Sequence, residues 1–135
     1  MFKIQSELGN GAELVAKKIT NSNNSGQYFP EPFQHIVIDN LFSQEFADSL
    51  LTHFPSPDDE CWDKSNDVGI EVKARTTWTS EFDIPEGIID AIRIFNSAPV
   101  LKAMSSALNI PKLMPDPYFT GGGLNMSERN GHLDV

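Results

Sequence analysis

The sequence predicts an α+β fold in which helices pack beside antiparallel strands. A β-branched run at His35–Asp39 leads into an amphipathic helix, and two further helical patterns follow it. Strand composition then returns at the C-terminal end, around the three consecutive glycines Gly121–Gly123. Because helices come first and antiparallel strands gather at the end, we expect an α+β or mostly-β barrel layout.

The composition is that of a soluble globular protein with one domain. The chain has 135 residues, of which 39% are hydrophobic and 21% are charged. Ten basic and nineteen acidic residues give a net charge of -9, whereas a nucleic-acid-binding surface needs a basic face. No run of about 18 apolar residues and no signal-peptide core are present. We therefore expect a cytoplasmic protein with neither nucleic acid nor membrane among its partners.

The first 29 residues are expected to form an N-terminal arm that ends in a flexible linker. A weak helical pattern covers Ala12–Ile19, and a polar stretch at Asn21–Gly26 follows it. The ordered domain is then expected to span residues 30–135. The chain has one cysteine, Cys61, which excludes an internal disulfide and favours a packing or surface role over a nucleophilic one.

The first strong helix signal lies at Gln44–His53. Ser43 is placed to cap its N-terminus, and Pro55 ends it. Its apolar residues form one continuous stripe, which predicts that the helix packs on the core. These residues are Phe46, Ala47, Leu50, Leu51 and Phe54. Pro55–Asp67 is then expected to be a loop.

Residues 70–82 alternate in polarity and predict a strand or hairpin arm with two unlike faces. One parity carries Val72, Ala74, Thr76, Trp78 and Ser80, and the other carries Lys73, Arg75, Thr77 and Thr79. Arg75 has two interpretations. Its guanidinium group suits a carboxylate ligand, and it also fits an ordinary surface arginine.

Two helices are expected between residues 83 and 109. Asp83–Pro85 starts the first, and Ser97–Pro99 starts the second. Asn109 is placed to take the left-handed C-terminal position before the proline at 111.

The last stretch, Met114–Val135, combines extended backbone, glycines and a turn. Tyr118–Thr120 has strand composition, and the glycines after it indicate a bulge, a bend or a close backbone approach. A phosphate-binding loop is excluded because no helix start and no Gly-Lys-Ser/Thr follow. Glu128–Gly131 predicts a hairpin turn that leads into a return strand.

His132 and Asp134 stand two residues apart on that return strand. Side chains at this spacing point to the same face. A two-histidine, one-carboxylate iron site obtains two of its three ligands in this way. The pair is therefore a candidate for two metal ligands.

Two phrases in this stretch, Pro115–Asn125 and Gly131–Val135, together resemble the 2-oxoglutarate and iron(II)-dependent oxygenases of the prolyl 4-hydroxylase-like group. His35–Phe42 with the helix after it is similar to the entry of that domain, so the resemblance covers residues 30–135. It implies a double-stranded β-helix, or jelly roll, of which this chain would be the N-terminal part. It also implies iron held by His-x-Asp and a distant histidine, with 2-oxoglutarate bound by a basic residue near the last strand.

In the family register, the His-x-Asp pair follows directly after Val135. The chain is then expected to be a fragment that ends just before the iron site, with no catalytic residue, no bound cofactor and no activity of its own. The 2-oxoglutarate-binding residues and the substrate, whether small molecule or peptide, stay unassigned. A register shifted by four residues makes His132 and Asp134 the ligands. A cupin-like module that is complete at Val135 and binds a small ligand or protein without metal is the alternative.

Overall fold

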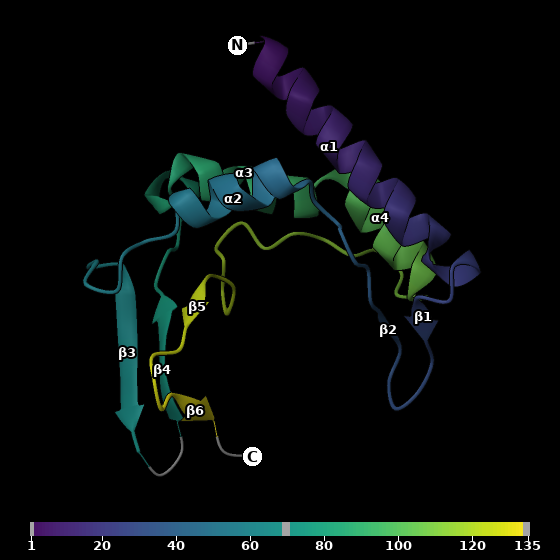
Figure 1. Ribbon diagram of the computed structural model, residues 1–135. Helices are drawn as coiled ribbons and strands as arrows, with labels where there is room; N and C mark the ends of the chain where they lie inside the picture. Colours follow the sequence, from purple (N-terminus) through teal and green to yellow (C-terminus); the bar gives the residue numbers. More distant parts are fainter. Residues whose placement is uncertain (1, 69–70, 134–135) are drawn as a thin grey trace. The chain divides into compact units, whose positions relative to one another are not determined.

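The computed structural model describes residues 2–68 and 71–133, with side chains from residue 7 onward (Figure 1). The chain divides into two compact units, and each is described by itself. Unit 1 comprises Met1–His53 and Glu86–Pro115, and unit 2 comprises Phe54–Pro85 and Asp116–Val135. Helices dominate unit 1 and an antiparallel sheet dominates unit 2, so the fold is α+β.

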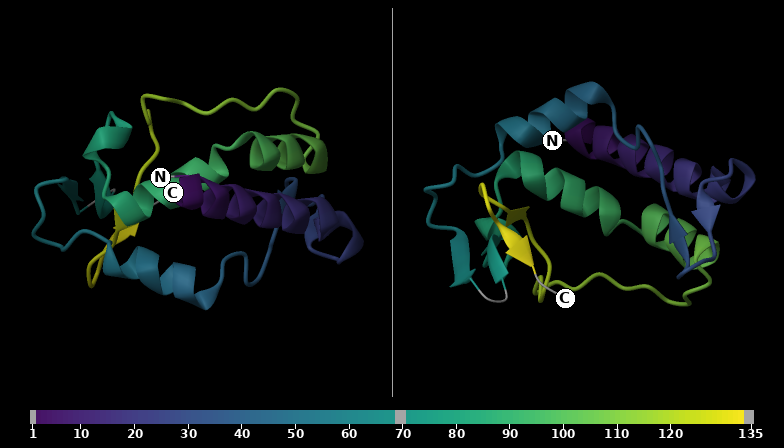
Figure 2. Two further views of the ribbon diagram at one scale, coloured as in Figure 1. Left: turned by 90° about the horizontal axis from the view of Figure 1, so that it is seen from above. Right: turned by 60° about the horizontal axis from the view of Figure 1, so that its bottom comes forward.

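Unit 1 contains helices α1 to α4 and a small hairpin. Their bounds are α1 Phe2–Asn21, β1 Tyr28–Phe29, β2 His35–Ile36, α2 Gln44–Thr52, α3 Glu86–Phe95 and α4 Ala98–Ala107. The hairpin pairs Phe29 with His35. Its second strand, β2, is shorter than the strand predicted at His35–Asp39. Helices α1 and α4 lie side by side (Figure 2).

Helix α1 is longer than the predicted pattern at Ala12–Ile19, and its apolar side is buried. Ala12 and Ala16 have small side chains that allow close helix packing, and Val15 is only 2% exposed. The stretch expected to be an arm is thus mostly a helix packed in unit 1. The core that it helps to form contains Ala12, Val15, Ala16, Ile19, Ile94, Val100 and Ala103.

The start signals of α2 and the end signal of α4 are confirmed. The Ser43 hydroxyl accepts a hydrogen bond from the Phe46 amide at 3.2 Å, which satisfies one of the free donors of the first turn. Asn109 has φ 53°, the predicted left-handed position. Two residues of the predicted α2 stripe differ, because Ala47 and Leu51 are exposed, Leu51 to 74%.

Unit 2 is built on a sheet whose central strand is β4, Glu71–Thr76. Strand β3, Trp62–Asp67, pairs with it in antiparallel register from Trp62 opposite Thr76 to Asp67 opposite Glu71. The prediction of a loop through Asp67 is therefore wrong in its second half. The polar side chains of β3 hide the strand in the sequence, and its pairing with β4 fixes it.

The end of the chain does not form the predicted hairpin. Strands β5, Asn125–Met126, and β6, His132–Leu133, both pair with β4, the first at Ala74 and Arg75 and the second at Glu71 and Val72. Both short strands therefore run in one direction along the same edge of β4, with residues 127–131 as an excursion between them (Figure 2). The Asn-Gly turn itself is present, with Asn130 at φ 72°.

Candidate functional site

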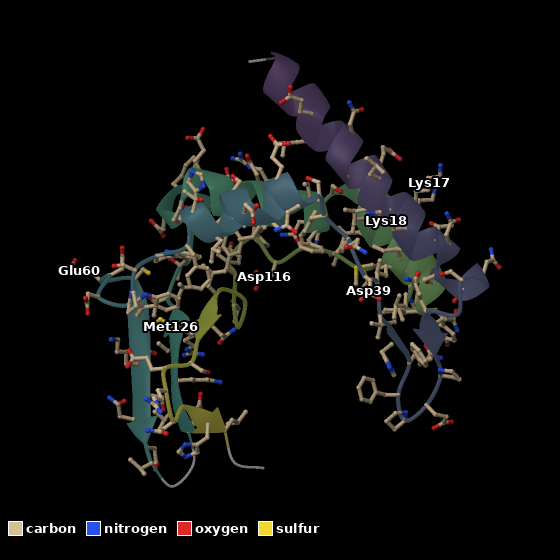
Figure 3. The ribbon with its side chains drawn as sticks, viewed as in Figure 1. Lys17, Lys18, Asp39, Glu60, Asp116 and Met126 are labelled. Carbon is tan, nitrogen blue, oxygen red and sulfur yellow. The ribbon has the colours of Figure 1, made fainter. Side chains whose placement is uncertain are left out.

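The glycine-rich segment is held at its start by Asp116, which Figure 3 labels. Its carboxylate accepts hydrogen bonds from the amides of Tyr118 at 2.9 Å and Thr120 at 2.7 Å. These two donors, the Tyr118 amide first, hold the pKa of Asp116 below its ordinary value. Tyr118–Thr120 is thus a turn closed by a side chain, and the strand predicted there is wrong.

The end of the glycine-rich segment is fixed by Thr76, the last residue of β4. The Thr76 hydroxyl accepts a hydrogen bond from the Leu124 amide at 3.0 Å, and the Thr76 amide donates to the Leu124 carbonyl at 3.0 Å. Gly123 has φ 142°, and a Cβ built on it would lie 2.5 Å from the Thr76 hydroxyl oxygen. The sequence predicted a bulge, a bend or a close backbone approach at the glycines, and Gly123 is the site of a close approach.

A groove of about 320 Å³ lies between residues 75–79 and residues 118–125. Burial alternates along residues 75–79 as predicted. Thr76 and Trp78 are buried, with 5% and 8% of their surface exposed. Arg75, Thr77 and Thr79 are the exposed residues of the other parity, and all three line the groove. The alternation predicted for residues 70–82 thus continues to Thr79, beyond the end of β4. The strand itself ends at Thr76, and Glu81–Asp83 form a short 3-10 helix, so the predicted strand is too long; residue 70 lies outside the described residues.

Sequence reasoning did not single out Thr76 or Asp116, although both shape this groove. The signal for Asp116 was present, because an Asp side chain two residues before a free amide commonly closes a turn. The signal for Thr76 was not local. Its partner Leu124 is 48 residues away in the sequence, so only the folded sheet brings the two together.

His132 lies on β6, where both of its ring nitrogens face carbonyl oxygens. Nε2 lies 3.0 Å from the Val68 oxygen, and Nδ1 lies 3.2 Å from the Asn130 oxygen. A metal ligand needs a nitrogen lone pair that is open to the ion. This arrangement therefore does not favour His132 as a ligand. Asp134, its predicted partner, lies outside the described residues.

The other histidines of the chain are also engaged with nearby groups. His35 lies against Phe29 with ring centroids 5.1 Å apart, and its Nδ1 lies 2.8 Å from the Phe33 oxygen. His53 Nδ1 lies 2.8 Å from the Ser49 oxygen. Among residues 2–68 and 71–133, no three His, Cys, Asp or Glu side chains come together to hold a metal ion. The described residues thus do not provide the iron site that the resemblance implies.

Cys61 is not placed as a nucleophile. Burial, followed by the nearby Asp59 carboxylate, raises the pKa of its thiol to about 11. Asp59 accepts a hydrogen bond from the Cys61 amide at 2.9 Å, and this bond lowers the pKa of the Asp59 carboxyl group. A thiol with a raised pKa is a poor nucleophile at neutral pH.

Unit 1 contains a larger, mainly apolar cavity of about 640 Å³ beside α1 and α2. Lys18, the basic residue in its lining, donates to the backbone oxygens of Asn40 and Leu41. Figure 3 labels Lys18 at this position. The ammonium group is therefore already used within the fold, and we consider the groove of unit 2 the stronger candidate for polar recognition.

Comparisons with protein-family models, curated proteins and solved structures found no match to this chain. In the part of the chain that the structure describes, no helix has both the length and the apolar character to cross a bilayer. The class of protein therefore rests on the residues and geometry of the chain itself.

Proposed function

We propose that this chain is part of a 2-oxoglutarate and iron(II)-dependent oxygenase domain of the prolyl 4-hydroxylase-like group. In this proposal, unit 2 contributes one wall of a double-stranded β-helix. The complete domain would hydroxylate a C-H bond of its substrate. The proposal starts from the resemblance of Pro115–Asn125 and Gly131–Val135 to that family.

The observation that carries the proposal is the path of β5 and β6 along one edge of β4. The chain after the glycine-rich segment begins to pair with this edge at Asn125, and His132–Leu133 pairs with the same edge after residues 127–131. Side chains on such a strand alternate between the two faces of the sheet. A His-x-Asp pair on a continuation of this strand would present both side chains to one face, as the family's iron site requires.

The alternation along β4 and the three residues after it also supports the proposal. Ala74, Thr76 and Trp78 are buried, whereas Arg75, Thr77 and Thr79 are exposed and line the groove. Along a barrel strand, side chains that face the interior of the barrel alternate with side chains that face outward. A polar, concave face next to the glycine-rich segment is suited to a substrate.

The proposal assigns no iron ligand and no 2-oxoglutarate ligand to the described residues. Both ring nitrogens of His132 face carbonyl oxygens, and the described residues contain no cluster of three candidate ligands. When bound in such a domain, iron(II) with 2-oxoglutarate would supply the oxidising chemistry, with dioxygen as the oxidant. The family register puts its first two protein ligands directly after Val135.

The nucleotide sequence that follows the Val135 codon tests the proposal first. We expect an open frame that encodes His-x-Asp at once and a further histidine several tens of residues later. In the presence of iron(II), ascorbate and dioxygen, the protein extended through these residues should convert 2-oxoglutarate to succinate and carbon dioxide. The matched control replaces the first encoded histidine with alanine and should abolish succinate formation.

Two outcomes would contradict the proposal. One is a continuation without His-x-Asp, and the other is an extended, folded protein that forms no succinate above the level of its alanine control. Either would favour the alternative of a small-ligand or protein-binding module without metal.

A further inference from the structure

We infer that the groove of unit 2 binds a small carboxylate ligand through Arg75. This inference does not depend on the oxygenase proposal. The resemblance assigns the 2-oxoglutarate carboxylate to a basic residue near the last strand of the domain, and Arg75 lies on β4. The groove is thus distinct from the 2-oxoglutarate site that the resemblance implies, and its ligand can be tested on this chain directly.

The charge of the groove differs from that of the chain. The protein has a net charge of -9, yet the groove lining contains Arg75 and no Asp or Glu. A site with one guanidinium group and otherwise neutral groups attracts an anion. A single positive charge balances one carboxylate better than a doubly charged phosphate, and the planar guanidinium fork matches carboxylate geometry.

Arg75 is available for a ligand. Its contact with Asp63 joins Nε to Oδ2 at 3.7 Å, and the two side chains are 62% and 57% exposed. Exposed ion pairs at this distance contribute little, about 0 to 1 kcal/mol. No other ion pair or hydrogen bond of the Arg75 side chain is present among the described residues.

Neutral donors stand on the same face as Arg75. Asn125 pairs directly with Arg75 across β4 and β5, so both side chains project from one face of the sheet. Thr77 and Thr79 have the same parity as Arg75 and are exposed in the groove. A carboxylate held by the guanidinium group could accept further hydrogen bonds from this row of side chains.

The opposite wall of the groove is already ordered, and it supplies an apolar surface. Asp116 closes the turn that carries Tyr118, and Thr76 holds Leu124 in place. The Tyr118 side chain is 72% exposed at the edge of the groove. A preformed site costs less ordering entropy on binding. An aromatic ring at the rim favours a carboxylate that has an apolar body.

Benzoate is the probe that tests this site. We expect saturable benzoate-induced shifts in the amide resonances of Asn125 and Gly122 in a nitrogen-proton correlation spectrum of the whole chain. Arg75→Gln should raise the dissociation constant at least tenfold. The matched control, Lys73→Gln, removes the same charge from the same strand face outside the groove and should change the constant less than twofold.

Asp63→Asn separates ligand binding from a structural role of Arg75. This substitution removes the carboxylate that competes for the guanidinium group, so benzoate should bind more tightly while the spectrum stays that of the folded chain. Non-saturable shifts, equal effects of the Arg75 and Lys73 substitutions, or weaker binding by the Asp63 variant would overturn the inference. Inorganic phosphate that binds as tightly as benzoate would overturn the assignment to a carboxylate.

Discussion

Thr76 and Gly123 approach so closely that residue 123 has no room for a side chain. A Cβ at this position would lie 2.5 Å from the Thr76 hydroxyl oxygen and 3.5 Å from the Thr76 carbonyl oxygen. Gly123 also has φ 142°, a backbone conformation that residues with side chains rarely adopt. This contact joins the glycine-rich segment to the end of β4.

Gly123→Ala should therefore destabilise the protein strongly. Backbone strain and overpacking each cost about 1 to 3 kcal/mol, so the free energy of unfolding should fall by about 2 to 5 kcal/mol. Urea denaturation followed by circular dichroism measures this change. Gly121→Ala is the matched control, because Gly121 has φ 76° and no atom within 4 Å of a built Cβ. Equal losses for the two variants would contradict the proposed contact.

The stability of the turn at Asp116 should depend on pH. The Tyr118 and Thr120 amides hold the pKa of this carboxyl group below its ordinary value. Because the pKa of this carboxyl group is lower in the folded protein, its ionised form stabilises the fold at a pH above the ordinary pKa, about 3.9. This stabilisation is lost as the pH falls through the pKa of the folded protein. The amide resonances of both residues should thus shift with a midpoint below about 3.9 in an acid titration.

Asp116→Asn is the control for this titration. The neutral amide cannot titrate, so the acid-dependent shift of the Tyr118 and Thr120 amides should disappear. A midpoint above that of a free aspartate in the unsubstituted chain would show that the two amides do not stabilise the carboxylate.

Local sequence signals predicted the parts of the fold that depend on local chemistry. The Ser43 cap and the left-handed Asn109 are both set within a few residues of the chain, and both were correct. Strand β3 was missed because Asp63, Lys64 and Asn66 are polar and exposed, so no hydrophobic alternation marks it. Only its pairing with β4 identifies it as a strand.

The prediction of the C-terminal hairpin failed for a related reason. The Asn-Gly turn is local and was predicted correctly, since the Gly131 amide donates to the Glu128 oxygen at 2.8 Å. The choice of a partner strand is not local. Both β5 and β6 pair with β4, which lies about 50 to 60 residues earlier in the chain and which a turn signal cannot identify.

Cys61 should react slowly with alkylating agents. Burial and the Asp59 carboxylate raise the pKa of the thiol to about 11, so the reactive thiolate is scarce at neutral pH. The rate of iodoacetamide modification should keep rising with pH and approach its plateau only above about pH 10, beyond the ordinary thiol pKa. Asp59→Asn should lower the midpoint of this profile, because it removes the negative charge. A midpoint near that of a free cysteine would contradict the burial of the thiol.

Gly87→Ala should destabilise the protein more in the unsubstituted chain than in a His53→Ala background. A Cβ at residue 87 would lie 2.5 Å from His53 Nδ1, so the substitution should lower the free energy of unfolding by about 1 to 3 kcal/mol. In a His53→Ala background the ring atoms are absent, and the Cβ of residue 53, 3.1 Å away, is the remaining close neighbour. The higher helix propensity of alanine, worth up to about 1 kcal/mol, should then offset much of the remaining loss. Urea denaturation of the four proteins tests the pair, and equal effects in both backgrounds would exclude this contact.

His132→Ala should leave metal binding by this chain unchanged. Both ring nitrogens face carbonyl oxygens, at 3.0 Å for Val68 and 3.2 Å for Asn130, so no lone pair is open to an ion. Cobalt(II), a spectroscopic substitute for iron(II), should produce the same weak absorption with the unsubstituted chain and the variant. The substitution should instead loosen the contact between β6 and residue 68, which hydrogen exchange at the Val72 and Leu133 amides can detect. Stoichiometric cobalt binding that His132→Ala abolishes would restore His132 and Asp134 as metal ligands, and the family register would then have to shift by four residues.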